Sequence, residues 1–497
     1  MIKKLLFFLV PALLQCLIAK TQQLKNESSR QPPALSAIRE ADLKKDLFAM
    51  SADHFKGRSA GTIDELTASM WCADQMRAAG LKPNGDNGTY FQFFDLWRNR
   101  ISASSSIRIG DRSFALWKDV IIAQTATANI SAPLFFLNNP SKADIEKADI
   151  KGKAVAVQVS AEDFNQNVSI PEWRFGGFLM RRYGNDLLAK GVAAIIFVAD
   201  DFAEKSWTQA SENYKRGLYD IEGGANALVT SKPPVLWIRK EALNFVKTST
   251  NLNANIQVDQ FLYPSVNVIG KIEGTDPKLK NEHVLFSGHQ DAHGIRNPYG
   301  TDTIYNGADD NASVNVAMLA VARAFKKNPA ARSALFVFHG AEERGLNGSK
   351  YYSSHPTVEK SSIVAVLNGD MIGRNHPDSA ALLGTQAPHR SSSELVKMAL
   401  DANNEGPRFK LDTLWDKVDH VEGWFFRSDH LPYVREGIPA LMYTTLLHAD
   451  YHTPMDDAEH IDYKKLKKMT DWIYRTGWKV ANEPKRPALE PNFKLER

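Results

Sequence analysis

Short apolar runs alternate with amphipathic segments through the last half of the chain. The apolar runs have the length of buried strands and lie at residues 268–272, 283–287, 333–338, 363–367 and 440–443. Residues 312–327, 392–403 and 463–480 instead repeat apolar positions at helical spacing. Alternation of strands and helices is typical of an α/β fold, so we expect a mixed, mostly parallel sheet with helices on both faces.

The middle of the chain has a different pattern. Between about residues 121 and 259, short β-branched runs are separated by Gly, Pro and Asn turns and by one helical stretch at 185–190. We therefore expect a small β-rich domain inserted into a larger one. The predicted division is residues 20–120 for the N-terminal part of the larger domain, 121–259 for the insert and 260–497 for the main part.

Residues 1–19 have the pattern of a secretory signal peptide. Two lysines precede an apolar run at residues 5–14, which is too short for a membrane span of about 20 residues. We expect cleavage near Ala19, export to the periplasm or the medium, and no stable membrane span afterwards. An uncleaved N-terminal anchor and a lipid anchor on Cys16 are the alternatives.

Composition narrows the chemistry. The 497 residues allow two or three domains, and a net charge of +4 without a basic tract argues against a nucleic-acid partner. After signal cleavage Cys72 is the only cysteine, so neither an internal disulfide nor a zinc-thiolate cluster can form. Any metal site must therefore consist of His, Asp and Glu. The sequence carries no signal for an oligomeric state.

Residues that can bind metal follow the predicted strands of the last half. Separately, each has an ordinary explanation as a solvated histidine, a surface glutamate pair or a helix cap. Together they would meet at one edge of the sheet, because sites in open α/β sheets form at the carboxyl ends of strands. They are His289 and Asp291, Glu342 and Glu343, Asp370, and His452, with Asp310 just before the helix at 312–327.

Two divalent metals a few ångströms apart account for these residue types. A shared carboxylate can bridge the ions, and each ion then takes a histidine and another carboxylate. Metal makes water more acidic, and a nearby carboxylate that binds no metal can take its proton.

The same segments resemble the motifs of the co-catalytic di-zinc aminopeptidase family, which also contains the glutamate carboxypeptidases and the transferrin-receptor ectodomain. They occur in the family's order over about residues 265–480: Gly288-His-Gln-Asp, Gly307-Ala-Asp-Asp-Asn, Gly340-Ala-Glu-Glu-Arg-Gly, Asn368-Gly-Asp-Met, Arg427-Ser-Asp-His and Tyr451-His-Thr-Pro-Met-Asp. Residues 51–62 resemble the family's N-terminal segment. The runs at 149–157 and 190–198 resemble a protease-associated (PA) domain, so a zinc-peptidase-like fold with a PA-like insert is implied.

The resemblance implies two zinc ions. Asp310 would bridge them, His289 and Asp370 would complete one shell, and Glu343 and His452 the other.

It also implies three supporting roles. Glu342 would be the general base, which passes its proton to the leaving amine. Asp291 would orient His289 by fixing the imidazole tautomer. Tyr451 is a candidate for stabilising the oxyanion, with an ordinary packed tyrosine as the alternative.

We therefore expect an exported zinc-dependent exopeptidase that acts on peptides. An aminopeptidase that removes N-terminal residues by metal-activated water comes first, and a carboxypeptidase or dipeptidase of the same family second. A non-catalytic, receptor-like metal-binding protein is a third possibility, against which the complete ligand set argues. Seven other histidines are expected to be surface or capping residues, any of which could line the cleft: His293, His355, His376, His389, His420, His448 and His460.

Overall fold

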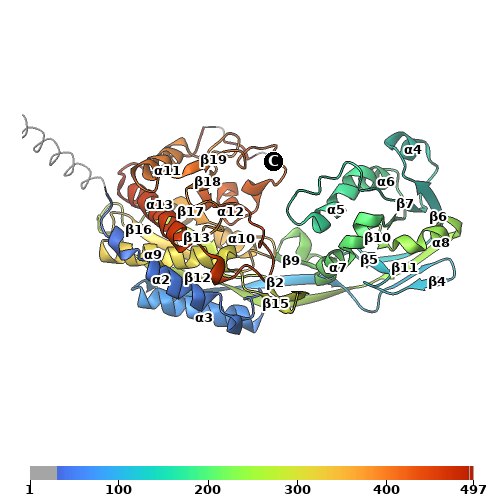
Figure 1. Cartoon of the computed structure of the whole chain (residues 1–497), viewed down its shortest axis with the longest axis horizontal. Helices are drawn as coiled ribbons and strands as arrows, with labels where there is room; N and C mark the ends of the chain where they lie inside the picture. Colours follow the sequence, from blue (N-terminus) through green and yellow to red (C-terminus); the bar gives the residue numbers. More distant parts are fainter. Residues whose placement is uncertain (1–30, 492, 496–497) are drawn as a thin grey trace, which may run out of the picture.

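The computed structural model describes residues 31–491 and 493–495 and has two lobes at opposite ends of its long axis (Figure 1). A ten-stranded sheet forms the larger lobe and an eight-stranded sheet the smaller lobe. Strands β2 (Phe91–Ile101) and β12 (Val258–Ile272) connect the lobes as an antiparallel ribbon, paired from Phe91↔Val268 to Ile101↔Val258. The predicted signal peptide and Cys16 lie outside the described residues.

The sheet of the larger lobe has the order β19-β18-β20-β17-β13-β16-β12-β2-β9, and β1 also pairs with β12. Its central strands β20, β17, β13 and β16 are parallel, and antiparallel pairs flank them. The mixed sheet predicted from the sequence is thus confirmed, with its parallel part at the centre. The other bounds are β1 (Lys82–Pro83), β9 (Leu218–Ile221), β13 (His283–His289), β16 (Ser333–His339), β17 (Ile363–Gly369), β18 (Ser379–Leu383), β19 (Lys410–Asp412) and β20 (Ala440–Thr444).

Helices cover both faces of this sheet. Successive strand residues point to opposite faces, so Phe286 and Phe336 pack in one core and Leu285 and Leu335 in the other. The first core includes α2 (Glu40–Met50), α3 (Ile63–Ala78), α9 (Ser313–Lys327), α11 (Ser393–Glu405) and α13 (Tyr463–Asn482). The second includes α10 (Asn347–Ser354) and α12 (His430–Arg435). The three helices predicted in the last half correspond to α9, α11 and α13.

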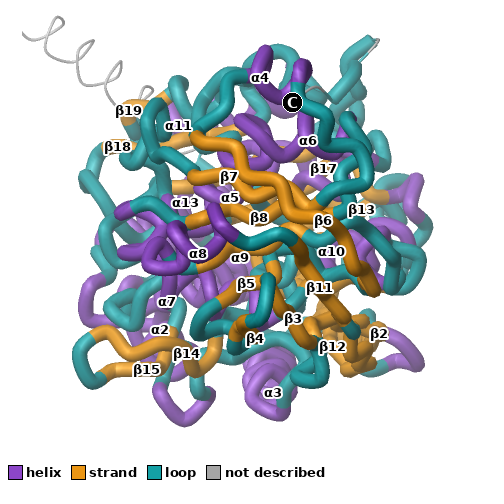
Figure 2. Tube along the Cα trace, turned by 90° about the vertical axis from the view of Figure 1, so that its right-hand side faces the viewer, coloured by secondary structure: helices purple, strands orange, loops and turns teal. Residues whose placement is uncertain are grey.

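The smaller lobe contains more helix than its sequence pattern predicted. Its sheet has the order β4-β3-β11-β6-β7-β8-β10-β5, in which β6, β7, β8 and β10 are parallel. Figure 2 shows β6, β7 and β8 in front of the larger lobe. The strands are β3 (Ser106–Ile109), β4 (Arg112–Phe114), β5 (Val120–Ile122), β6 (Ala128–Asn138), β7 (Ala154–Gln158), β8 (Ala194–Val198), β10 (Val235–Ile238) and β11 (Asn251–Ile256). The helices are α4 (Lys142–Lys147), α5 (Pro171–Leu179), α6 (Asn185–Ala189), α7 (Asp201–Arg216) and α8 (Leu243–Thr248).

Two details differ from the predicted division. The smaller sheet begins at Ser106, before residue 121, because the β3–β4 hairpin pairs with β11. Strand β9 lies within the predicted insert but pairs with β2 in the larger sheet. Helix α7 accounts for much of the unexpected helix: Asp200 caps its first turn, and Trp207 and Ala210 are buried against the sheet.

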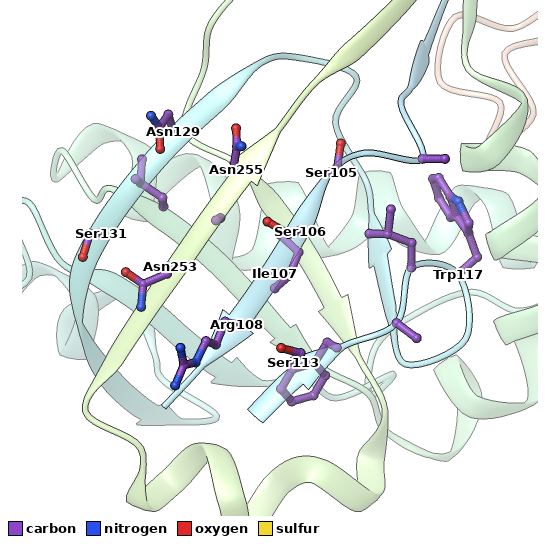
Figure 3. A pocket seen from close by; sticks show the side chains of 16 residues that line it. Ser105, Ser106, Ile107, Arg108, Ser113, Trp117, Asn129, Ser131, Asn253 and Asn255 are labelled. Carbon is purple, nitrogen blue, oxygen red and sulfur yellow. The ribbon is translucent and has the colours of Figure 1, made fainter. Parts of the chain in front are cut away.

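An open hollow of about 920 Å³ lies on the outer strands of the smaller lobe (Figure 3). Hydroxyl, amide and guanidinium groups stand over it from β3, β6 and β11, including Ser106, Arg108, Asn129, Ser131, Asn253 and Asn255. None of the residues singled out by the metal-site prediction lines this hollow. Along residues 31–491 and 493–495, no helix combines the length and the apolar composition needed to cross a membrane.

Glu65 joins α3 to the sheet from a fully buried position. Its carboxylate accepts hydrogen bonds from the Gly61 backbone N–H at 2.7 Å and from the Ser265 hydroxyl at 2.6 Å. Burial raises the pKa of the Glu65 carboxyl to about 8, with a further contribution from Asp291, although both hydrogen bonds oppose the shift. The folded protein therefore retains this proton well above the usual pKa of 4.5.

This shift predicts a fall in stability as the pH rises from about 5 to about 8. In that window the unfolded chain has lost the Glu65 proton while the folded chain retains it, so folding takes up a proton. Glu65→Gln preserves both contacts without the titration. We expect its thermal midpoint at about pH 8 to exceed that of the wild type by a few degrees. Calorimetry across the window tests this, with Glu146→Gln on the exposed face of α4 as the control; parallel curves for wild type and Glu65→Gln would contradict it.

Candidate metal centre

The parallel strands deliver the predicted ligands to one edge of the larger sheet. β13 ends at His289, and β16, β17 and β20 end next to it in the same direction. Glu342 and Glu343 follow β16, Asp370 follows β17, and His452 lies on the loop after β20. Asp310 lies in the short turn η7 (Ala308–Ala312) that precedes α9. All the predicted ligands are thus brought together.

His289 is the centre of one group. Its side chain is fully buried, and its Nε2 atom lies 3.1 Å from Asp310 Oδ1, 3.8 Å from Glu342 Oε2 and 3.9 Å from Asp370 Oδ1. That Nε2 atom has no hydrogen-bond partner among the described residues. Burial opposes protonation of His289, but the surrounding carboxylates raise its pKa well above the usual value. The site therefore attracts a positive charge to this point.

A second group surrounds His452. Its Nε2 atom lies 3.2 Å from Asp310 Oδ2 and 3.4 Å from Glu343 Oε2. The two oxygens of Asp310 thus face the two predicted histidine ligands separately, as a bridging carboxylate would. Burial opposes ionisation of Asp310, but the adjacent histidines lower its pKa below the usual value.

Asp456 holds Asp310 in this orientation, a role that the sequence prediction missed. Its carboxylate accepts the backbone N–H of Asp309 at 2.9 Å and that of Asp310 at 3.0 Å. Burial raises the pKa of Asp456 to about 7, with Asp309 adding to the shift. In the sequence, Asp456 is distinguished only by its position four residues after His452, in a motif to which only His452 and Tyr451 were assigned roles.

Asp291 lies beside His289, as predicted, and its carboxylate makes further contacts that the sequence did not predict. The His289 Nδ1 atom lies 3.1 Å from the Asp291 main-chain oxygen and 3.7 Å from its carboxylate. The carboxylate instead accepts the backbone N–H groups of Glu342 at 3.0 Å and Glu343 at 3.2 Å. Asp291 therefore fixes the glutamate pair with its side chain and contacts His289 with its backbone.

Glu342 belongs to the first group: one ligand atom each of Glu342, His289 and Asp370 lies within 4.8 Å of the others. Burial raises its pKa well above the usual value; His289 opposes the shift, while Glu343 and Asp370 add to it. Such a carboxyl group binds a proton readily, as a general base must.

Tyr451 is half-buried beside the second group, and its ring stacks on His452 with centroids 3.6 Å apart. Arg427 Nη2 donates a hydrogen bond to the Tyr451 hydroxyl oxygen at 2.9 Å. Burial raises the pKa of Tyr451 well above its usual value, although Arg427 opposes the shift. The hydroxyl therefore keeps its own proton available for donation. Arg427 was not singled out from the sequence.

His293 corrects the expectation that it is a surface or capping residue. It is 7% exposed, and its Nε2 atom lies 3.2 Å from Glu343 Oε2. Its ring meets the His452 ring at 88° with centroids 4.0 Å apart. Burial lowers its pKa well below the usual value, and His452, Arg296 and Arg344 add to the shift. The available signal was its position two residues after Asp291.

The donor set fits zinc. Imidazole nitrogens and carboxylate oxygens are ordinary zinc ligands, and two ligands of a tetrahedral ion with bonds of about 2.0–2.1 Å are about 3.3–3.4 Å apart. The contacts around Asp310 and His452 measure 3.1–3.4 Å. The imidazole Nε2 of His289 and the Oε1 of Glu343 are buried without hydrogen-bond partners in the described chain.

Comparison with known proteins identifies the family. Residues 267–476, which contain every predicted ligand, match the sequence profile of Peptidase family M28. This region belongs to peptidase family M28. Aminopeptidase YwaD of Bacillus subtilis (strain 168) is 26% identical to the chain over 358 residues, which are 67% of this chain and 71% of that protein.

Solved structures support the same fold for both lobes of the chain. The aminopeptidase from Aneurinibacillus sp. strain AM-1 superposes with a TM-score of 0.58 at 18% identity, over 92% of this chain and 97% of that one. BSAP, a zinc aminopeptidase from Bacillus subtilis, superposes with a TM-score of 0.56 at 19% identity, over 92% of this chain and 99% of that one. Both alignments are too long to be confined to the larger lobe.

The hydrogen bonds of Asp291 to the Glu342–Glu343 turn predict that the Asp291 carboxylate is needed for activity or metal binding. Asp291→Asn replaces one acceptor with a donor that faces a backbone N–H, so the Glu342–Glu343 turn loses its fixed position. We expect a loss of about 10- to 100-fold in peptide hydrolysis or metal affinity, the usual range for a residue that orients ligands.

Asp276→Asn is the matched control. Asp276 also accepts two backbone N–H groups, from Lys278 and Leu279, but it precedes β13 and so lies at the opposite edge of the sheet. Equal activity and metal affinity for Asp291→Asn and Asp276→Asn would show that the Asp291 carboxylate is dispensable.

Proposed function

We propose that this M28 peptidase is an aminopeptidase that uses two zinc ions to remove N-terminal residues from peptides. The observation that carries the proposal is Asp310, which lies between the buried His289 and the half-buried His452 with one carboxylate oxygen directed toward each. The relatives named above are aminopeptidases, and BSAP is described as a zinc enzyme, which supports the metal and the end of the peptide that is cleaved.

The chain offers each ion its own ligands. His289 and Asp370 would hold one zinc, Glu343 and His452 the other, and Asp310 would contribute to both. Two zinc ions would supply Lewis acidity, polarising the scissile carbonyl and making water nucleophilic near neutral pH.

Glu342 is placed to move the proton. Its Oε2 atom faces His289 at 3.8 Å, at the edge of the ligand cluster, and the Asp291 carboxylate fixes its backbone. In the proposed reaction Glu342 accepts a proton from the attacking water and passes it to the departing amine.

Tyr451 is placed to stabilise the developing negative charge on the carbonyl oxygen. The Arg427 guanidinium donates to its hydroxyl oxygen, which leaves the phenolic hydrogen free to point to substrate. The nearby positive charge of Arg427 also makes this hydroxyl a stronger donor.

The proton-transfer role predicts a selective loss in Glu342→Gln. The amide preserves the shape but cannot accept a proton, so turnover should fall by about 10²- to 10⁴-fold while zinc content stays unchanged. Aminoacyl amides and a peptide library read by mass spectrometry provide the measurement. Glu359→Gln, at the exposed start of η8 (Lys360–Ser362), should match the wild type.

The same library tests which end is cleaved. An aminopeptidase leaves N-acetylated peptides intact, whereas a carboxypeptidase cleaves them. Undiminished turnover by Glu342→Gln would overturn the role of the base, and cleavage of acetylated peptides from their C-terminus would overturn the aminopeptidase assignment.

The smaller lobe contacts this machinery through Glu422. The Glu422 carboxylate accepts hydrogen bonds from the Ser169 hydroxyl at 2.6 Å and from Arg174 at 2.7 Å, both in the smaller lobe. It also accepts from Arg427 at 2.9 Å, the residue that donates to Tyr451. Glu422 and Arg427 thus connect the smaller lobe to the Tyr451 hydroxyl.

This connection predicts that Glu422→Gln lowers kcat through Tyr451. Loss of the carboxylate charge frees Arg427 to move, and we expect a decrease in kcat of about 10-fold, since a weakened orienting contact costs about 1–2 kcal/mol. Glu204→Gln is the matched control, because Glu204 also pairs with an arginine and a backbone N–H, those of Arg239 and Lys240, but within the smaller lobe.

A double mutant tests the route. If Glu422 acts through Tyr451, the Tyr451→Phe/Glu422→Gln variant should be no slower than Tyr451→Phe alone. Additive losses in the double mutant would mean that Glu422 acts elsewhere.

A further inference from the structure

His293 is a buried histidine beside the candidate ligands, and the proposed zinc sites leave it unassigned. We propose that His293 is an additional zinc ligand, which joins Glu343, His452 and Asp310 at the same ion. The inference rests on the proposed function, since it needs the two-zinc site. Its consequence is that the two zinc ions are held differently.

The distances around Glu343 carry the first step. Its Oε2 atom lies 3.2 Å from His293 Nε2 and 3.4 Å from His452 Nε2. These separations match the roughly 3.3–3.4 Å between two ligands of one tetrahedral zinc ion. One ligand atom from each of the three residues lies within 4.8 Å of the others. The two imidazoles therefore converge on the same carboxylate oxygen.

The second step is the state of the His293 ring. Neither ring nitrogen of His293 has a hydrogen-bond partner among the described residues, and the residue is only 7% exposed to solvent. A buried polar group left unpaired costs about 1–3 kcal/mol, so such groups need a reason. A small cavity of about 10 Å³ lies between His293, Asp310, Glu343 and His452. A cation shared by these four residues satisfies the lone pair.

The third step is that the backbone holds His293 in place without metal. The Gly294 N–H donates to the Gly57 carbonyl at 2.9 Å, and the two backbones are so close that a Cβ on Gly57 would lie 2.9 Å from the Gly294 nitrogen. The buried Arg58 donates to the carbonyls of Gln290 at 2.8 Å and Asn306 at 2.7 Å, on the two loops that carry His293 and Asp310. The N-terminal segment thus fixes both sides of this ligand group.

The consequence is that the two ions are unequal. Asp310, Glu343, His452 and His293 make four protein ligands, the closed set typical of structural zinc sites. The ion at His289, Asp370 and Asp310 has three protein ligands and an open position, as in catalytic zinc sites. We therefore expect one tightly held zinc at His293 and one weaker, exchangeable zinc at His289.

Metal titration of the purified full chain tests this independently of activity. Wild type should bind two zinc ions with separated affinities, measured by competition with a chromogenic chelator. His293→Ala should weaken the tighter ion by about 100-fold or more, which exceeds the 10- to 100-fold range for residues that only orient a ligand. His355→Ala, at the exposed end of α10, should bind like the wild type.

A second variant protects the test against misfolding. His293→Cys supplies a thiolate, which is also a zinc ligand, so it should recover most of the lost affinity. The visible absorption of the cobalt-loaded protein should change in His293→Cys but not in His355→Ala, because a sulfur ligand adds a charge-transfer band.

Three outcomes separate the failures. Loss of affinity in His293→Ala with recovery in His293→Cys supports the ligand. Unchanged zinc affinity in His293→Ala, or a loss below about 100-fold that cysteine does not recover, overturns it while the proposed function stands. Fewer than two zinc ions in the wild type overturns the proposed two-zinc function and this inference with it.

Discussion

Many carboxylates are buried at one edge of the larger sheet, and the structure depends on positive charge that compensates them. Carboxylates crowd this edge with little solvent contact: Asp291, Asp309, Asp310, Glu342, Asp370, Asp429 and Asp456. Buried charge costs several kcal/mol per ion unless it is paired. Arg58 is a buried cation near this edge, but its hydrogen bonds go to main-chain carbonyls. It therefore acts on the carboxylates through its charge and not through direct pairing. Two divalent cations would compensate the cluster far better than the histidines alone.

The fold divides these carboxylates between two tasks. Asp291 and Asp456 each accept two backbone N–H groups, which offsets their burial and fixes the turns that carry Glu342, Glu343 and Asp310. Asp310 and Glu343 are thereby free to direct their oxygens at imidazoles. This division explains why the site has more acidic residues than metal binding alone would need: some orient the candidate ligands instead of binding metal.

The sequence predicted the site residues that directly follow strands. It did not predict those whose position depends on loops or on contacts with distant segments. His289 and Asp370 were recognisable because they follow strongly apolar strands whose carboxyl ends meet at one edge. His293 was not, because its burial depends on the distant pairing of Gly294 with Gly57, which no local pattern contains. Helix α7 was also missed, although its buried residues Ala203, Trp207 and Ala210 recur at helical spacing in the sequence.

The contact between the lobes gives the smaller lobe a place in the chemistry. Glu422 is the shared acceptor for Ser169, Arg174 and Arg427, so the position of the smaller lobe and the charge near Tyr451 cannot change independently. The lobes are also joined by the long β2–β12 ribbon and by a hydrogen bond from Arg296 of the larger lobe to Asn213 of α7 at 2.8 Å (Figure 1). A movement of the smaller lobe that broke the Glu422 contacts would leave the candidate metal ligands in place, because Asp291, Asp456 and Arg58 hold them from within the larger lobe. The proposed role of Tyr451 would therefore depend on lobe position, while the candidate metal ligands stay fixed.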